Sequence, residues 1–188
     1  MPHAIILVRH ALPEVTRGLA PSLWPLTEAA REDCVLLAYH LPGHLAPVVL
    51  ASPERKADET ARVIAMRRGL QAELDRNLRE VSRPDDWVGD YRDRAAAYLE
   101  GNEQPGWEPR DAVVRRIHAA LEPHLAKPGD GDLVVVGHGM SLSLYLASLA
   151  GIGAVPFWRA LTFPDAWRLD LATRELTHLF LTGAPAEG

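Results

Sequence analysis

Three continuous apolar runs limit the folds open to this chain. They are "AIILV" (4–8), "PVVLAS" (47–52) and "LVVVGH" (133–138). None alternates with polar residues, as a half-exposed strand would, so each predicts a strand that is buried on both faces. Helix-forming segments separate the runs. Strands that alternate with helices predict an α/β fold, which here is a three-layer sandwich with a mostly parallel sheet.

The segments between the runs carry ordinary start and stop signals for helices. Thr27 is a typical N-cap residue, and Pro53 suits the first turn of a helix. The apolar residues of 110–126 recur at helical spacing, and those of 166–181 alternate on either side of a turn. We expect helices over 27–39, 53–68, 110–126 and after the third run, a short strand within 71–81, and a hairpin over 166–181.

Length and composition describe an ordinary soluble protein. The 188 residues suit one domain spanning residues 1–188. The net charge of −5 is scattered, which argues against nucleic acid or an anionic membrane as the main partner. A single cysteine allows no internal disulfide, and no apolar run is long enough to span a bilayer or resembles a signal peptide. We therefore expect a cytoplasmic protein.

Polar residues follow the apolar runs at the point where each strand should end. Arg9 and His10 follow the first run, Arg55 comes just after the second, and His138 stands at the end of the third. The carboxyl ends of parallel strands meet at one edge of a sheet, where ligands bind. Glu80, in the loop after the short strand, could join them there. This set is far more informative than any one of its members.

These residue types suit the chemistry of phosphoryl transfer. The planar guanidinium groups of Arg9 and Arg55 match the oxygens of a phosphoryl group, and a helix N-terminus adds backbone donors. A neutral imidazole can attack phosphorus and form a phosphohistidine. A carboxylic acid can protonate the leaving oxygen and then accept a proton from water. Arginines and a second imidazole could replace a metal ion.

Five segments carry a resemblance to a known family. In order, they are "LVRHALPE", "PLTEAARE", "ASPERKADETA", "LREV" and "VVVGHGMSL". Together they resemble the histidine phosphatase superfamily, the relatives of cofactor-dependent phosphoglycerate mutase, over residues 4–150. The resemblance implies a phosphoglycerate mutase-like fold. We expect no cofactor and no metal ion. It implies the following roles: His10 as phosphorylated nucleophile, Glu80 as proton donor, and Arg9, Arg55 and His138 at the phosphoryl oxygens. We also expect Gly139 to bind the phosphoryl group.

A phosphorylated His10 sets two geometric conditions. Attack requires the far ring nitrogen to be free, so the near nitrogen should donate to a backbone carbonyl. Arg9 and His10 are neighbours, and adjacent side chains of a strand point to opposite faces. Both can face one phosphoryl group only if the strand ends or twists at Arg9.

The chain departs from the family pattern in three places. Ala11 follows the first histidine where glycine is usual, so the backbone there must avoid torsions that only glycine tolerates. Ala30 also replaces a common glycine. Lys56 stands where a small residue often follows Arg55. None of these changes removes a catalytic side chain. The polar residues that often follow the first histidine are also replaced, here by "ALPEV" (11–15), and this change puts the phosphate-loop contacts, the rate and the substrate in question.

Two assignments stay open at this point. Four other loop acids compete with Glu80 as proton donor: Glu14, Glu54, Asp85 and Asp86. Four aromatic residues could line a substrate site or simply anchor the long loops: Trp24, Trp87, Tyr91 and Trp107.

The expected activity is hydrolysis of a small phosphorylated metabolite, with a homodimer as an open option. An α/β-hydrolase is disfavoured, because Ser141 is out of register for its nucleophile elbow. A mutase-type phosphotransferase is the nearer alternative. The family's mutases have a longer segment before the second histidine and a longer tail than the one expected to be disordered after Leu181. A non-catalytic module that only binds a phosphorylated ligand is the third alternative.

Overall fold

The computed structural model describes residues 2–84, 90–127 and 131–181. The sequence predictions for Asp85, Asp86, Trp87 and the segment after Leu181 fall outside these ranges. No helix within the described ranges is both long enough and apolar enough to cross a membrane.

A six-stranded sheet runs through the molecule in the order β3-β2-β4-β1-β5-β6. The strands are β1 (Ala4–Arg9), β2 (Leu45–Ala51), β3 (Gln71–Leu74), β4 (Asp132–Gly137), β5 (Asp165–Asp170) and β6 (Leu176–Leu181). Strands β1 to β4 run parallel to one another, whereas β5 pairs antiparallel with β1 and β6. The predicted mostly parallel sheet and the C-terminal hairpin are therefore confirmed.

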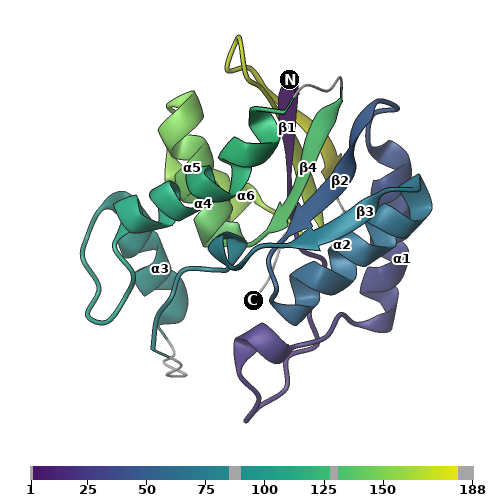
Figure 1. The fold of residues 1–188 in the computed structure, drawn as a ribbon. Coiled ribbons are helices and arrows are strands. Elements are labelled where there is room, and N and C mark those ends of the chain that lie inside the picture. The colour runs from purple at the N-terminus through teal and green to yellow at the C-terminus, as the bar shows by residue number, and fades with distance from the viewer. Residues whose placement is uncertain (1, 85–89, 128–130, 182–188) are drawn as a thin grey trace.

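Helices cover both faces of the sheet (Figure 1). They are α1 (Glu28–His40), α2 (Arg55–Arg68), α3 (Tyr91–Glu100), α4 (Arg110–Leu125), α5 (Gly139–Ala150) and α6 (Ala154–Ala160), with the short 3-10 helices η1 (Pro21–Leu23) and η2 (Arg76–Leu78). Helices α1 and α2 lie on one side, and α3 to α6 lie on the other. Thr27 caps α1 as expected, because its hydroxyl accepts the N–H of Ala30 at 3.1 Å.

The central strands form the core because both of their faces are covered. In β1, Ile5 packs into the cluster beneath α4 and α5, and Ile6 into the cluster beneath α1 and α2. Every residue of β4 is buried. Burying a side chain of this size stabilises the fold by roughly 1.5–3 kcal/mol, which explains why these strands read as unbroken apolar runs.

The sheet brings three strand ends together at one edge. Arg9 is paired with Gly137, and the N–H of His10 extends this ladder to the carbonyl of Gly137 at 3.0 Å. On the other side of β4, the N–H of Ser52 donates to the carbonyl of Val136 at 3.0 Å. The residues that follow β1, β2 and β4 are thus fixed side by side.

Candidate active site

His10 lies just beyond β1 and is almost completely enclosed. Its ring centroid is 5.1 Å from that of His138 and 5.3 Å from that of Phe163. Its Nδ1 lies 2.8 Å from the carbonyl oxygen of Ala11, the acceptor expected for the near nitrogen. The Nδ1–H tautomer that donates to this carbonyl leaves Nε2 with a free lone pair. His10 therefore has the geometry of a nucleophile.

The surroundings of His10 favour its neutral form. Burial lowers the pKa of His10 well below its usual range, and the nearby His138, Lys56 and Arg9 lower it further. Next to it, the N–H of Ala11 donates to the hydroxyl of Thr60 at 3.1 Å. Ala11 is not among the described residues with positive φ, so alanine fits here without strain.

Arg9 reaches the same site from the end of β1. Its Nη1 donates to the carbonyl of Leu161 at 3.0 Å, and its guanidinium lies 3.5 Å from the centroid of the Phe163 ring. Its Nε is buried and has no hydrogen-bond partner. A Cβ on Gly139 would lie 3.4 Å from that Nε. Burial lowers the pKa of Arg9 to about 10, so Arg9 remains a cation at neutral pH.

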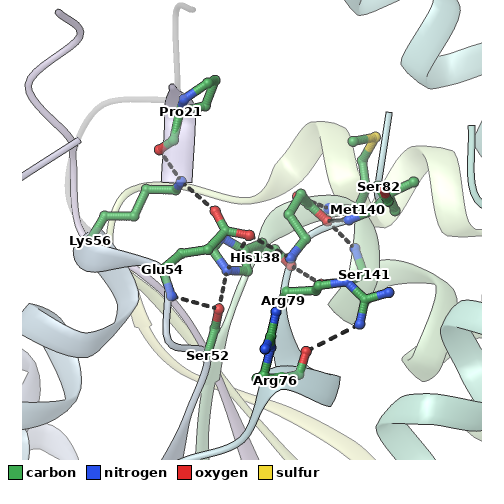
Figure 2. Close-up of polar contacts among 12 residues, drawn as sticks. Pro21, Ser52, Glu54, Lys56, Arg76, Arg79, Ser82, His138, Met140 and Ser141 are labelled. Atoms are coloured by element: carbon green, nitrogen blue, oxygen red, sulfur yellow. Dashed lines mark hydrogen bonds and ion pairs between the residues drawn. The ribbon is translucent and has the colours of Figure 1, made fainter. Parts of the chain in front are cut away.

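His138 precedes α5 and is 1% exposed. Its Nε2 lies 2.8 Å from the Ser52 hydroxyl and 3.5 Å from Oε1 of Glu54 (Figure 2). Its Nδ1 is buried with no hydrogen-bond partner. Burial lowers the pKa of His138 well below its usual range, and nearby cations, led by Lys56, act in the same direction.

Glu80 is brought to the N-terminus of α5, next to His138. Its Oε1 accepts the N–H groups of Val81 and Ser141, both at 2.9 Å, and its Oε2 accepts that of Met140 at 3.1 Å. Arg116 donates to the carbonyl of Glu80 at 3.1 Å and so holds the loop from α4. The expected loop acid is thus part of the site, and its carboxylate is fixed by backbone donors.

Arg55 is not brought to the site, which corrects its expected placement. Its Nε donates to Glu59 at 2.8 Å, and its side chain is 54% exposed. Lys56 stands at the site instead. Its Nζ donates to Oε2 of Glu54 and to the carbonyl of Pro21, both at 2.7 Å, and its side chain is 8% exposed (Figure 2).

The position of each residue around the axis of α2 explains why Lys56 reaches the site and Arg55 does not. Successive helical residues are about 100° apart, so one helix face holds residues three and four positions apart. The buried residues of α2 are Lys56, Ala57, Thr60, Ala61, Ile64 and Ala65. Arg55 lies on the opposite face with Glu59 and Arg62. The apolar residues of 57–65 already marked the inner face in the sequence, and the small residue expected after the cation is Ala57.

Glu54 is the second acid of the site, whereas Glu14 lies in the loop before α1, where its backbone N–H donates to the carbonyl of Pro25 at 2.8 Å. The carboxylate of Glu54 lies between Lys56 and His138 (Figure 2). It also accepts the N–H of Glu80 at 2.8 Å. Burial opposes its ionisation, but the charge and hydrogen bond of Lys56 hold the pKa of Glu54 below its usual range. Glu54 is therefore a carboxylate at neutral pH.

Of the aromatic residues considered for substrate binding, Tyr91 and Trp107 lie together on the α3 side of the fold. Tyr91 stacks with Trp107 at a centroid distance of 6.4 Å, and Arg83 lies 5.0 Å over the Tyr91 ring. Trp24 belongs to the loop before α1, where its indole N–H donates to the carbonyl of Leu19 at 3.1 Å. These contacts anchor the loops.

A family model decides the relationship of this chain to known proteins. The model of the histidine phosphatase superfamily, branch 1, matches residues 5–168. The chain belongs to the histidine phosphatase superfamily. The match includes all three strand ends that form the site, so the site residues described above lie within the matched region.

Curated relatives within the superfamily include "Probable phosphoglycerate mutase GpmB" of Yersinia pestis and of Yersinia pseudotuberculosis. Each is 30% identical to this chain over 140 residues. The match covers 69% of this chain but only 65%, slightly less than two thirds, of the relatives' length.

Solved structures share the fold at lower identity. A mycobacterial glucosyl-3-phosphoglycerate phosphatase with inorganic phosphate is similar with a TM-score of 0.71 and 22% identity, covering 97% of this chain and 98% of that one. A candidate alpha-ribazole-5'-P phosphatase from Escherichia coli gives 0.68 and 22%, covering 100% of both chains. At this identity, these likenesses establish the histidine phosphatase fold alone.

Proposed function

We propose that this protein is a phosphomonoester hydrolase that acts through a phosphohistidine on a small phosphorylated metabolite. One observation carries the proposal. Two buried polar atoms without partners, Arg9 Nε and His138 Nδ1, belong to side chains that flank His10, whose Nδ1 is held by a carbonyl. An unpaired buried polar group costs about 1–3 kcal/mol, so an anion with several acceptor oxygens is a favourable occupant.

The reaction has two steps. First, Nε2 of His10 attacks phosphorus, the bond to the ester oxygen breaks, and that oxygen leaves as an alcohol after taking a proton. Then water attacks the phosphorus of the phosphohistidine, loses a proton, and releases phosphate with neutral His10. Glu80 is the group we assign to both proton transfers, since it lies at the start of α5 beside His138.

The residues that neither attack phosphorus nor transfer protons stabilise the negative charge of the phosphoryl group. Arg9 and Lys56 are cations, and His138 supplies a ring nitrogen from the third strand end. Charged donors fixed in a water-poor site stabilise the negative charge that spreads over the equatorial oxygens. We assign phosphoryl binding to Arg9, Lys56, His138 and the backbone at Gly139, and not to Arg55.

The second candidate is a phosphotransferase of the mutase type. It is favoured by one observation, the curated relatives named as phosphoglycerate mutases. The two candidates share the first step and differ in what attacks the phosphohistidine. Phosphate release from phosphorylated protein in plain buffer would support the hydrolase, and release only with an added sugar-acid acceptor would support the mutase. A protein that binds phosphate esters without releasing phosphate would be a binding module.

Activity should not depend on a divalent metal. Arg9 and Lys56 supply the positive charge that a metal ion would otherwise bring to the phosphoryl oxygens. We expect the purified protein to release phosphate from at least one member of a panel of small phosphomonoesters, at the same rate with and without EDTA. The proposal of a metal-independent site fails if EDTA abolishes the release and Mg²⁺ restores it.

Lys56 should matter for catalysis and its neighbour Arg55 should not. Loss of a charge-assisted hydrogen bond costs about 1.5–3 kcal/mol, so Lys56→Met should lower kcat/KM by about 10- to 100-fold. Arg55→Met is the matched control, because it removes an adjacent cation whose side chain pairs with Glu59 on the outer face of α2. We expect it to stay within about twofold of the parent. A larger loss in Arg55→Met than in Lys56→Met would return the phosphoryl contact to Arg55.

A further inference from the structure

We propose that Glu54 is a positioning residue that allows His138 to carry a second proton while the phosphoryl group is in the site. This inference rests on the proposed function and adds a residue to it. Glu54 would act through His138 and would not touch the substrate. The resulting imidazolium would stabilise the phosphoryl charge at the transition state.

The geometry is that of a carboxylate behind an imidazole. Oε1 of Glu54 lies 3.5 Å from Nε2 of His138, and the Ser52 hydroxyl lies 2.8 Å from the same nitrogen. The Ser52 oxygen also accepts the N–H of Glu54 at 3.2 Å. All polar contacts of the ring are therefore on its Nε2 side, and Nδ1 is left for the anion.

Two further contacts hold the Glu54 carboxylate in this position. Oε2 accepts from Lys56 Nζ at 2.7 Å, and Oε1 accepts from the N–H of Glu80 at 2.8 Å. The carboxylate cannot turn away from His138 without losing both of them. Helix α2 thus supplies the partner for the histidine that precedes α5.

The resting site keeps His138 neutral. It is buried near Lys56 and Arg9, and both cations disfavour a second proton. A phosphoryl group at Nδ1 adds negative charge that offsets these cations. With the phosphoryl group on one side and Glu54 on the other, the imidazolium lies between two anions.

The extra proton has a simple source. A phosphomonoester has a second pKa of about 6, so near neutral pH part of it binds as the monoanion and carries a proton into the site. That proton moves to His138, which then holds N–H groups toward both Glu54 and the phosphoryl oxygens. It leaves with the product as phosphate monoanion, so the cycle is balanced.

Charged and titratable groups face His138 from every side, and they will contribute to any pH profile. They are Arg9 at the end of β1, His10 just after it, Glu54 and Lys56 at the start of α2, Glu80 and Arg83 in the loop after η2, and Arg116 on α4. Comparison of variants in this fixed background is therefore more informative than the profile of the parent protein alone.

The kinetic test is Glu54→Gln, which keeps the size of the side chain and removes its charge. In serine proteases, loss of the analogous carboxylate costs roughly 10⁴ in kcat. Here Ser52 still orients the ring, so we expect a fall in kcat of at least about tenfold with little rise in KM. Glu54→Asp should recover part of the rate. The matched control is Asp58→Asn, which removes a carboxylate of α2 that pairs with Arg62 on the surface.

A binding test separates this role from a plain charge effect. Removal of any negative charge from the site should raise the affinity for all anions alike. Loss of transition-state stabilisation should instead lower the affinity for a transition-state mimic relative to that for a ground-state ligand. We expect Glu54→Gln to lower the ratio of vanadate affinity to phosphate affinity by at least about tenfold. Equal tightening of both anions with unchanged kcat would overturn the proposal.

Nitrogen NMR of histidine-labelled protein gives a readout that needs no turnover. The two ring nitrogens differ strongly in shift in neutral imidazole and become nearly equal in imidazolium. The His138 signals, assigned by their absence in His138→Asn, should report imidazolium in the vanadate complex of the parent and neutral imidazole in that of Glu54→Gln. If vanadate binds and His138 has the same charge in both proteins, the inference about Glu54 fails and the proposed function is unaffected. If the parent neither binds vanadate nor releases phosphate, the proposed function fails as well.

Discussion

Replacement of His10 by alanine is expected to reduce phosphate release to background. No other described residue combines enclosure at the end of a buried strand, a near nitrogen tied to a carbonyl, and a ring adjacent to Arg9 and His138. Without a nucleophile the phosphohistidine cannot form, and water must attack the ester directly. The loss should therefore exceed the effect of removing any charge-stabilising group.

The covalent step is measured by rapid quench with a ³²P-labelled substrate. Acid-labile, base-stable label should appear on His10 in the parent and should be absent from His10→Ala. The exposed His40→Ala is the matched control, because it removes an imidazole at the end of α1 and should retain both label and rate. A His10→Ala protein with normal phosphatase activity would contradict both the mechanism and the assignment of the site.

The lowered pKa of His10 predicts how kcat/KM should depend on pH. Because burial lowers that pKa well below the usual 6.5, the nucleophile stays neutral as the pH falls through 6.5. The acid limb that His10 contributes to kcat/KM should therefore lie below that of an exposed histidine.

Replacement of His138 by alanine is expected to lower kcat by at least about 100-fold, the scale of losing one fixed donor at a developing charge. His138 is 1% exposed, its Nε2 is held by Ser52, and its Nδ1 has no partner until an anion binds. In the proposed mechanism, His138 would stabilise the phosphoryl group without becoming bonded to it. The variant should therefore still be phosphorylated on His10, but slowly.

Single-turnover labelling distinguishes this role from that of the nucleophile. His138→Ala should accumulate label on His10 over a longer time, whereas His10→Ala should accumulate none. Circular dichroism and thermal melting would establish that the cavity left by the ring has not unfolded the protein. Label found on His138 in the parent would reverse the two roles.

Much of the fold was predictable because its strongest signals are local. The runs of β1 and β4 needed no tertiary information, since only a doubly covered strand tolerates such residues. Boundaries were less accurate: α2 begins at Arg55 and not at Pro53, because Ser52 first accepts the N–H of Glu54 in an extended turn. Strand β2 begins at Leu45, two residues before the run that predicted it.

The candidate site was predictable wherever a strand end fixes the side chain. Arg9 ends β1, and His10 and His138 directly follow β1 and β4, so their meeting follows from the parallel order of the sheet. Arg55 was misplaced because its position depends on the phase of α2, and a shift of one residue turns a side chain by about 100°. The inward face defined by Ala57 and Ala61 would have selected Lys56.

The roles of Ser52 and Glu54 could not be read from the sequence. Their contacts with His138 depend on side-chain rotamers. The contact between Ser52 and His138 also joins residues that lie 86 positions apart in the chain. Glu54 appeared only as one of several loop acids. What distinguishes it is the combination of Lys56, the N–H of Glu80 and His138 around one carboxylate, which exists only in the folded chain.

The wide spacing of the site along the chain also has a consequence for folding. Arg9 contacts the carbonyl of Leu161 across 152 positions, and β1 is completed only when β4 and β5 have both joined it. Contacts between distant positions form slowly, because long loops must close before the contacts can stabilise them. Recovery of activity after dilution from denaturant should therefore lag behind recovery of helical signal, and its rate would measure how fast the central sheet is assembled.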